Sequence, residues 1–324
     1  MHPDDQQLYR LLEDRVGSVH LRQRLGIESD REALVFGQGR TFFHIENWYG
    51  LTVVIRAVFH LTLLHARARR NALDIELRHN TIHVPELPPA VHGFTILHIS
   101  DLHLDMNGDL PHVLAERVME LDYDICVLTG DYRYRTSGPF EAALAGMERV
   151  RLHLRDPVYG VLGNHDSIRM VPRLEAMGIH MLINESVTLE YKGHVIFIAG
   201  IDDPHYYRAE NFDRACRHLT HDAVSILLAH SPEVYKHAAH TGFNIMLCGH
   251  THGGQLCLPG GKPILVDADC PRKYCVRAWQ YHELQGYTSV GAGSSLVDLR
   301  FNNRPEITLH RLHGADSNKG ACEP

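Results

Sequence analysis

Downstream of residue 89, short apolar runs alternate with segments whose apolar residues recur every three to four positions. Six apolar runs predict buried strands, and they cover residues 94–100, 125–130, 158–163, 195–201, 224–230 and 243–250. The segments 111–120, 139–154, 168–177 and 208–219 have the periodicity of amphipathic helices. This alternation predicts an α/β domain with crossover helices. The last part, which includes 288–293, 296–301 and 306–312, predicts strands without long helices.

Residues 84–89 read Val-Pro-Glu-Leu-Pro-Pro, and their prolines cannot continue a helix or a central strand. We therefore expect an N-terminal extension over residues 1–84, a main domain over 85–313 and a tail over 314–324.

Within the extension, residues 45–70 predict one amphipathic helix that ends in a group of arginines. Thr52, Arg56, His60, Arg67 and Arg70 fall on one stripe at about 100° per residue, which leaves a wide apolar face. The central arginine makes this run marginal for crossing roughly 30 Å of hydrocarbon, and a position in the membrane interface suits it better. Burial against the main domain or a dimer partner explains the apolar face equally well.

Composition excludes several classes of protein. The chain has 324 residues, of which 44% are hydrophobic and 22% charged, as in an ordinary globular protein. A net charge of −7 disfavours a general nucleic-acid binder, which needs a basic surface. Seven cysteines without paired spacing favour a reducing compartment, and the N-terminus lacks the pattern of a signal peptide. We expect a cytoplasmic protein, attached peripherally to the inner face of the cytoplasmic membrane if the helix meets lipid.

Side chains that commonly bind metals follow five of the predicted strands, at the point where each strand ends. In chain order they are Asp101 and His103, then Asp131, then Asn164 with His165 and Asp166, then His230, then His250 and His252. Functional groups collect beyond the carboxyl ends of strands in α/β folds. One Asp-x-His arises easily by chance in a chain with 26 histidines, but five such strand ends in one domain do not. The joint pattern predicts a functional site.

The types of ligand indicate the chemistry. Carboxylates, imidazoles and one amide oxygen, without a thiolate, suit divalent ions such as Mn²⁺, Fe²⁺ or Zn²⁺. Seven ligands are too many for one tetrahedral ion and suit two ions, about 3.5 to 4 Å apart, that share a bridging carboxylate. Such a pair can hold the attacking and leaving oxygens of a phosphoryl transfer in line, with a metal-bound hydroxide as the nucleophile.

The blocks Asp-Leu-His at 101–103, Gly-Asp at 130–131, Gly-Asn-His-Asp at 163–166, the isolated His230 and Gly-His-Thr-His at 249–252 resemble the signature of the calcineurin-like metallophosphoesterases. The resemblance covers residues from about 92 to 312 and implies a four-layer α/β/β/α sandwich that hydrolyses a phosphodiester or pyrophosphate bond. Residues 249–255, 200–204 and 300–312 further resemble the subgroup with bacterial membrane-associated phosphoesterases and UDP-2,3-diacylglucosamine pyrophosphatase-like enzymes. A lipid-linked substrate such as UDP-2,3-diacylglucosamine is one expectation from this resemblance.

The resemblance also implies roles for individual residues. One metal would be bound by Asp101, His103 and His252, the other by Asn164, His230 and His250, with Asp131 as the bridge. His165 would stabilise charge on the phosphate or protonate the leaving oxygen, and Asp166 would orient His165 or cap the following helix. Many members have an acidic residue after the Gly-Asp block, where this chain has Tyr-Arg-Tyr-Arg. Arg133 and Arg135 are therefore candidate phosphate clamps, with solvent-facing positions as the alternative. His205 lies in a candidate substrate loop.

Two other functions use the same features. A nuclease or cyclic-nucleotide phosphodiesterase would need the same metal centre, although the net negative charge disfavours a nucleic acid as partner. A catalytically silent metal-binding scaffold would be expected to have lost ligands or His165, and none is missing here. The sequence leaves the oligomeric state open.

Overall fold

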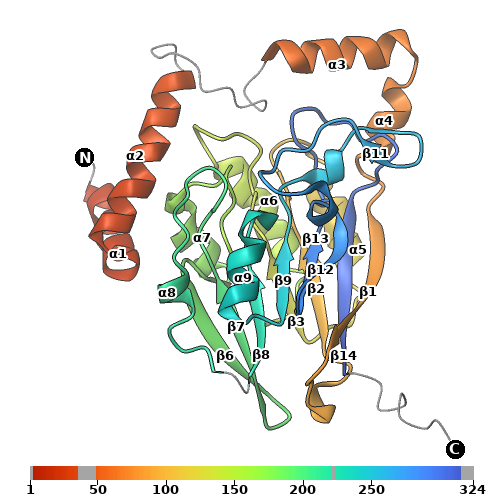
Figure 1. Ribbon diagram of the computed structural model, residues 1–324. Helices are drawn as coiled ribbons and strands as arrows, with labels where there is room; N and C mark the ends of the chain where they lie inside the picture. Colours follow the sequence, from red (N-terminus) through yellow and green to blue (C-terminus); the bar gives the residue numbers. More distant parts are fainter. Residues whose placement is uncertain (1–2, 36–48, 221–222, 315–324) are drawn as a thin grey trace, which may run out of the picture.

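The computed structural model describes residues 3–35, 49–220 and 223–314, and Figure 1 shows its strands flanked by helices. The first sheet has the order β1 (Glu76–Val84), β14 (Glu306–Gly314), β2 (Thr95–Ile99), β3 (Ile125–Leu128), β4 (Val158–Gly160) and β5 (Ile179–Met181). The second has the order β12 (Arg277–Tyr281), β13 (Leu284–Thr288), β9 (Ile245–Cys248), β8 (Val224–Leu228), β7 (His194–Gly200) and β6 (Glu185–Tyr191). A separate small hairpin consists of β10 (Cys257–Leu258) and β11 (Lys262–Pro263).

Alternating side chains of the central strands place the two sheets face to face. Ile96 of β2 and Leu247 of β9 belong to one core between the sheets, whereas their neighbours Leu97 and Met246 belong to two outer cores. The first outer core lies under α5 (Leu110–Val118), α6 (Glu141–Arg151) and α7 (Val171–Ala176), and the second under α8 (Phe212–Ala215) and α9 (Tyr235–Thr241). Because successive strand residues point to opposite faces, each sheet is buried on both sides. The predicted α/β/β/α sandwich is confirmed.

The six strands predicted downstream of residue 89 are present as β2, β3, β4, β7, β8 and β9. Three other predicted elements are wrong in extent or in kind. The strand expected over 288–293 is β13, which lies earlier in the chain and ends at Thr288. The helix expected over 208–219 is only α8. It begins after Asn211, whose side chain caps the helix and accepts a hydrogen bond from the backbone N–H of Arg214, and it ends at Ala215. The segment 296–301 makes one isolated bridge, at Phe301, in place of a strand, and the φ of +60° at Leu296 interrupts an extended chain.

The boundary expected at Pro85 falls directly after a strand of the first sheet. That strand, β1, pairs in parallel with β14 from Glu76, opposite Glu306, to Val84, opposite Gly314. Residues 76–84 therefore belong to the same folded unit as the strands downstream. The prolines end β1 at the surface, which is why their position suggested a domain boundary.

The single helix expected over 45–70 is also corrected. Residues 45–48 lie outside the described part of the chain, and the rest forms α3 (Tyr49–Leu61) and α4 (His65–Asn71), which are bent by 114°. Leu63 has a φ of +59°, a conformation that cannot continue an α-helix. Among the described residues no single helix is long and apolar enough to cross a membrane, and only the bent pair passes that test together.

Two further helices, α1 (Pro3–Val16) and α2 (Ser18–Val35), form a hairpin beside α7 and α8 (Figure 1). The hairpin is attached to the edge strands of both sheets, because Arg15 of α1 donates to Glu185 of β6 and to the backbone carbonyl of Met181 in β5. Leu12 and Val16 extend the first outer core. The N-terminal helices are thus packed onto the sandwich.

Candidate metal centre

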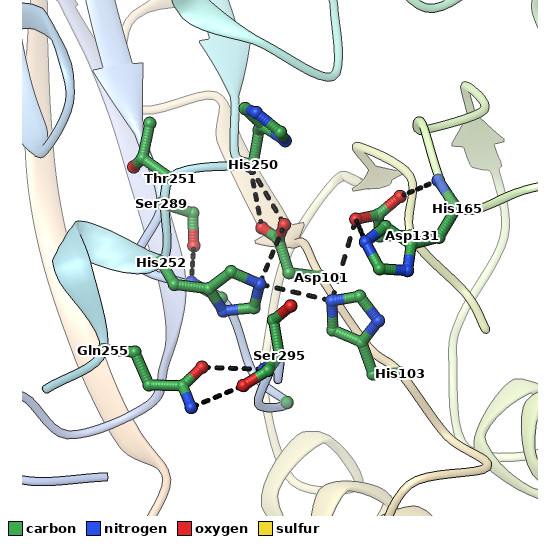
Figure 2. A network of polar contacts seen from close by, with 12 residues as sticks. Asp101, His103, Asp131, His165, His250, Thr251, His252, Gln255, Ser289 and Ser295 are labelled. Atoms are coloured by element: carbon green, nitrogen blue, oxygen red, sulfur yellow. Dashed lines mark hydrogen bonds and ion pairs between the residues drawn. The ribbon is translucent and has the colours of Figure 1, made fainter. Parts of the chain in front are cut away.

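The carboxyl ends of β2, β3 and β4 in the first sheet and of β8 and β9 in the second meet at one end of the sandwich. The seven expected metal ligands follow these strands, and all are at least nine-tenths buried: Asp101, His103, Asp131, Asn164, His230, His250 and His252. Figure 2 shows Asp101 and Asp131 among the imidazoles of His103, His165 and His252. The structure thus brings together all seven residues that the sequence singled out.

One group of potential ligand atoms comes from Asp101, His103 and His252. The Nε2 atoms of the two histidines are 3.2 Å apart, and His252 Nε2 is 3.6 Å from Asp101 Oδ1. A second group comes from Asp131, His230 and His250, whose ligand atoms lie within 4.8 Å of one another. These spacings are those expected between neighbouring ligands of one ion with bonds of about 2.0 to 2.2 Å.

Asp131 lies between the two groups. Its Oδ2 is 3.7 Å from His103 Nε2 and 3.4 Å from His230 Nε2. Asn164 belongs on the His230 side, because its Oδ1 is 2.9 Å from His230 Nε2. Two adjacent ions would be held by these two groups, with the Asp131 carboxylate within reach of both.

Two of the histidines, His103 and His230, are held by backbone carbonyls with Nε2 toward the centre. His103 Nδ1 donates to the backbone carbonyl of Arg133 at 2.9 Å, and His230 Nδ1 donates to the carbonyl of Thr129 at 2.7 Å. In the neutral rings the lone pair is therefore on Nε2, which faces the centre. Burial lowers the pKa of His230, but the carboxylates of Asp131 and Asp101 outweigh burial and raise that pKa well above its ordinary value. A metal ion on this side would take the place of the proton on Nε2, which lies 2.9 Å from Asn164 Oδ1. The residues fit two divalent ions.

Electrostatics agree with this donor set. Burial, opposed by His230 and assisted by Asp131, raises the pKa of Asp101 to about 6. Burial would also raise the pKa of Asp131, but His165, His230 and His103 outweigh it and hold that pKa well below its ordinary value. Burial and the nearby His165 lower the pKa of His103 to about 4. At neutral pH the centre therefore presents ionised carboxylates and a neutral His103 to a cation.

Local backbone conformation turns five of these side chains toward the centre. Asp101, His103, Asp131, His250 and His252 have φ values between +42° and +73°. Non-glycine residues rarely adopt such values, and they persist where the surrounding structure enforces them, frequently at functional sites. The sharp turn after each strand is therefore part of the site.

Comparison with known proteins identifies the family. A family model described as calcineurin-like phosphoesterase matches residues 94–254. The metallophosphoesterase YkuE of Bacillus subtilis is 30% identical over 250 residues, which cover 74% of this chain and 85% of YkuE. The chain belongs to the calcineurin-like phosphoesterase family.

Two other members of the family have names that state an activity. Phosphodiesterase YaeI of Escherichia coli is 28% identical, over 68% of this chain and 82% of YaeI. UDP-2,3-diacylglucosamine pyrophosphatase LpxG of Chlamydia trachomatis is 25% identical, over 53% of this chain and 67% of LpxG. Together with the family model, they show that this calcineurin-like phosphoesterase is a hydrolase of phosphoester bonds.

His165 faces the centre, and a backbone carbonyl orients its ring. Its Nδ1 donates to the backbone carbonyl of Tyr134, and its Nε2 lies 3.8 Å from Asp131 Oδ2. The main-chain N–H of His165 also donates to Asp131 Oδ1, at 2.9 Å. The carbonyl oxygen of Tyr134 thus fixes the ring so that Nε2 points toward Asp131, and sequence patterns cannot locate such a carbonyl.

Asp166 has neither of its two expected roles. Its carboxylate accepts hydrogen bonds from the backbone N–H groups of Asp131 at 2.7 Å, Tyr132 at 2.9 Å and Gly163 at 2.9 Å. The cap of the following helical turn is Ser167, whose side chain accepts from the backbone N–H of Arg169. Asp166 therefore joins the loop after β3 to the loop after β4 and so positions the predicted bridging carboxylate.

The three expected substrate-binding residues occupy different environments. The guanidinium of Arg133 is buried and donates to the backbone carbonyls of His165, Gly138 and Thr136, which favours a structural role over the expected phosphate contact. Arg135 is exposed. The ring of His205 is centred 4.1 Å from that of His250, at the border of the metal centre.

Two residues that the sequence reasoning missed hold the other side of the centre. Arg300 is fully buried and donates to the backbone carbonyls of Val290 and His252. Gln255 donates to the carbonyl of Ser295 and accepts from its N–H, as Figure 2 shows. A polar residue after Gly-His-Thr-His was a signal for the glutamine, whereas nothing in the sequence marked Arg300 as buried.

Proposed function

We propose that this phosphoesterase uses two divalent ions, of manganese, iron or zinc, to hydrolyse a phosphodiester or pyrophosphate bond. The observation that carries the proposal is the convergence of seven buried ligands in two groups around Asp131. When bound, such ions would supply Lewis acidity and would lower the pKa of a water molecule that serves as the nucleophile.

The side chains of this protein then divide the remaining work. His165 Nε2, held toward the centre by the carbonyl of Tyr134, donates a hydrogen bond to the phosphate or a proton to the leaving oxygen. His205 accompanies it as a cationic contact for a non-bridging phosphate oxygen. Burial lowers the pKa of His205, but its 2.8 Å contact with Glu233 outweighs burial and raises the pKa to about 9. We assign the exposed Arg135 to the more distant part of a substrate.

The test is metal-dependent hydrolysis of an aryl phosphodiester and an aryl pyrophosphate by the full-length chain. Metal-stripped protein should be inactive and should regain activity with Mn²⁺, Fe²⁺ or Zn²⁺. Asp131→Ala and His250→Ala should abolish activity and lower the metal content below two ions per chain. Undiminished turnover by the metal-stripped protein would exclude this mechanism. Cleavage of single-stranded DNA in preference to both small substrates would favour the nuclease alternative.

We further propose that the substrate is linked to a lipid, as the name of LpxG states for that relative. The supporting observation is a cavity of about 240 Å³ between α3 and the loops that follow β9 and β13. His250 and His252 contribute to its wall, and its apolar lining comes from Leu51, Ile55, Leu256, Leu265, Leu296 and Val297. A hydrocarbon chain in this cavity would have its phosphate at the metal centre.

The two faces of α3 differ, and the difference fits a protein at a membrane surface. Ile55 and Phe59 pack against the catalytic domain, which agrees in part with the expected alternative of burial. Val54 and Val58 face outward, and Leu61 and Leu63 at the bend are 84% and 89% exposed. An exposed apolar helix face beside the cavity opening is suited to insertion into the headgroup region of a lipid surface.

Two substitutions on α3 separate substrate binding from membrane binding. Ile55→Asn, which faces the cavity, should remove the fall in KM with increasing alkyl chain length in a series of alkyl phosphodiesters, and should leave vesicle flotation unchanged. Val58→Glu, on the outer face, should reduce flotation with vesicles containing phosphatidylglycerol and leave the chain-length series unchanged. A wild-type protein without chain-length dependence would exclude the lipid-linked substrate. Equal flotation of the wild type and Val58→Glu would exclude the membrane contact.

A further inference from the structure

Helix α2 reaches the catalytic end of the sandwich with two buried charged residues. Arg24 is fully buried and Glu28 is 6% exposed, whereas Arg22 on the same helix is exposed. Buried charges are costly unless they are paired and hydrogen-bonded, so their positions indicate specific partners. Those partners lie in two loops that carry site residues.

Arg24 connects the two loops. Its Nη2 donates to the backbone carbonyl of Asp166 at 3.2 Å, one residue after His165, and its Nε is 3.2 Å from Asp202 Oδ2. Its guanidinium also lies over the ring of Tyr207, 3.3 Å from the centroid. Asp166 follows β4 of the first sheet, and residues 202–207 follow β7 of the second and contain His205.

Glu28 holds the first of these loops one helical turn further along. Its carboxylate accepts from Ser167 Oγ at 2.7 Å and from the backbone N–H of Ile168 at 2.9 Å. In the second loop, Asp203 accepts from the backbone N–H groups of His205, at 3.2 Å, and Tyr206, at 2.8 Å, which ties His205 to the residue next to Asp202. One helix, α2, therefore contacts both the loop of His165 and the loop of His205.

We infer that Arg24 and Glu28 are positioning residues of the active site, and that α2 sets the spacing between the loops that carry His165 and His205. The two loops belong to different sheets, so sheet pairing alone does not fix their separation. Effective catalysis requires reacting groups held within a fraction of an ångström, and a misplacement of about 1 Å costs up to about 100-fold in rate. The inference rests on the proposed hydrolysis, and turnover by the wild-type protein tests the proposed hydrolysis separately.

The chain offers a matched control. Arg15, on α1 of the same hairpin, also makes a forked set of contacts, with Glu175 of α7 and Glu185 of β6, and neither partner belongs to the two loops. Lysine retains the charge of arginine and loses the planar fork that contacts two partners at once. Arg24→Lys and Arg15→Lys thus remove the same guanidinium fork at two places in one hairpin.

The experiment measures kcat, KM, metal content and thermal unfolding for the full-length variants with an aryl phosphodiester. Arg24→Lys should lower kcat at least tenfold at full metal occupancy and change the pH–rate profile, whereas Arg15→Lys should keep the wild-type kcat. Glu28→Gln, which disturbs only the first loop, should lower kcat severalfold with KM unchanged, and it serves as the test if Arg24→Lys does not fold. Wild-type kcat in Glu28→Gln and Arg24→Lys, or an equal loss in Arg15→Lys, would overturn the inference.

Discussion

Replacement of Asp166 by asparagine tests how the site is positioned. The carboxylate accepts four backbone hydrogen bonds. Two reach Oδ2, from Asp131 at 2.7 Å and Gly163 at 2.9 Å, and two reach Oδ1, from Tyr132 at 2.9 Å and from Arg133 at the longer distance of 3.4 Å. Burial, together with the charge of Asp131, raises the pKa of Asp166 to about 6, so the group is ionised at pH 7.5. The bonds are then charge-assisted.

The magnitude follows from these contacts. If the amide oxygen of the introduced asparagine takes the place of Oδ2, two bonds remain as weaker neutral ones, and the N–H of Tyr132 faces the amide nitrogen. A buried donor without an acceptor costs about 1–3 kcal/mol, and the loss of charge assistance adds roughly 1 kcal/mol. We therefore expect Asp166→Asn to lower the free energy of unfolding by about 2–4 kcal/mol. Because the bonds position Asp131, metal affinity or kcat should fall about 10- to 100-fold.

The assays are urea unfolding at pH 7.5 with EDTA, metal titration and steady-state hydrolysis. Asp124→Asn is the matched control, because its carboxylate accepts from the backbone N–H of Thr95 at 2.7 Å at the other end of β2. It should destabilise the fold by about 1 kcal/mol and leave metal affinity unchanged. If Asp166→Asn unfolded at the same urea concentration as the wild type and changed only the pH dependence of kcat that His165 causes, Asp166 would orient His165 and would not hold the loop of Asp131.

Three further results are expected. The folded-state pKa of His205, about 9, lies above its ordinary value of 6.5. The contact with Glu233 therefore contributes stability below pH 6.5 that is lost as the pH rises through 9. Glu233→Gln should remove this pH dependence of the free energy of unfolding, and an unchanged dependence would contradict the assignment. Gly249→Ala should prevent metal uptake in elemental analysis, because its Cβ would lie 2.3 Å from Asp101 Oδ2, whereas Gly108→Ala, with nothing within 4 Å, should bind metal normally. Chelation should lower the melting temperature and metal addition restore it, since ligands gathered around a cation stabilise the folded state; an identical temperature with and without metal would count against the centre.

Much of the site could be predicted from the sequence because its geometry depends on local patterns. Asp101, Asp131 and Asn164 each follow a buried parallel strand, and the carboxyl ends of parallel strands lie at one edge of a sheet. The residue that ends such a strand is thereby directed to that edge wherever the strand occurs in the chain. The same reasoning placed His230 and His250 without any knowledge of which sheet contained them.

What surrounds the ligands depends on contacts between distant parts of the chain. Asp166 is next to His165 in sequence, yet its carboxylate holds backbone groups of another loop, because the turn after β4 directs it there. Arg24 meets the carbonyl of Asp166 across 142 positions, and no pattern around either residue announces the contact.

The α/β class, the seven candidate ligands and the class of chemistry could be inferred from the order of residues, since alternation and strand ends are local properties of the chain. The arrangement in two packed sheets was implied only by the resemblance to a known family. Three other features could be known only from the folded molecule: β1 joins the first sheet, α3 ends before Leu63, and α2 holds the loop of His165. Each of these depends on which distant surface is available for packing, and burial free energy is gained only when the two surfaces meet.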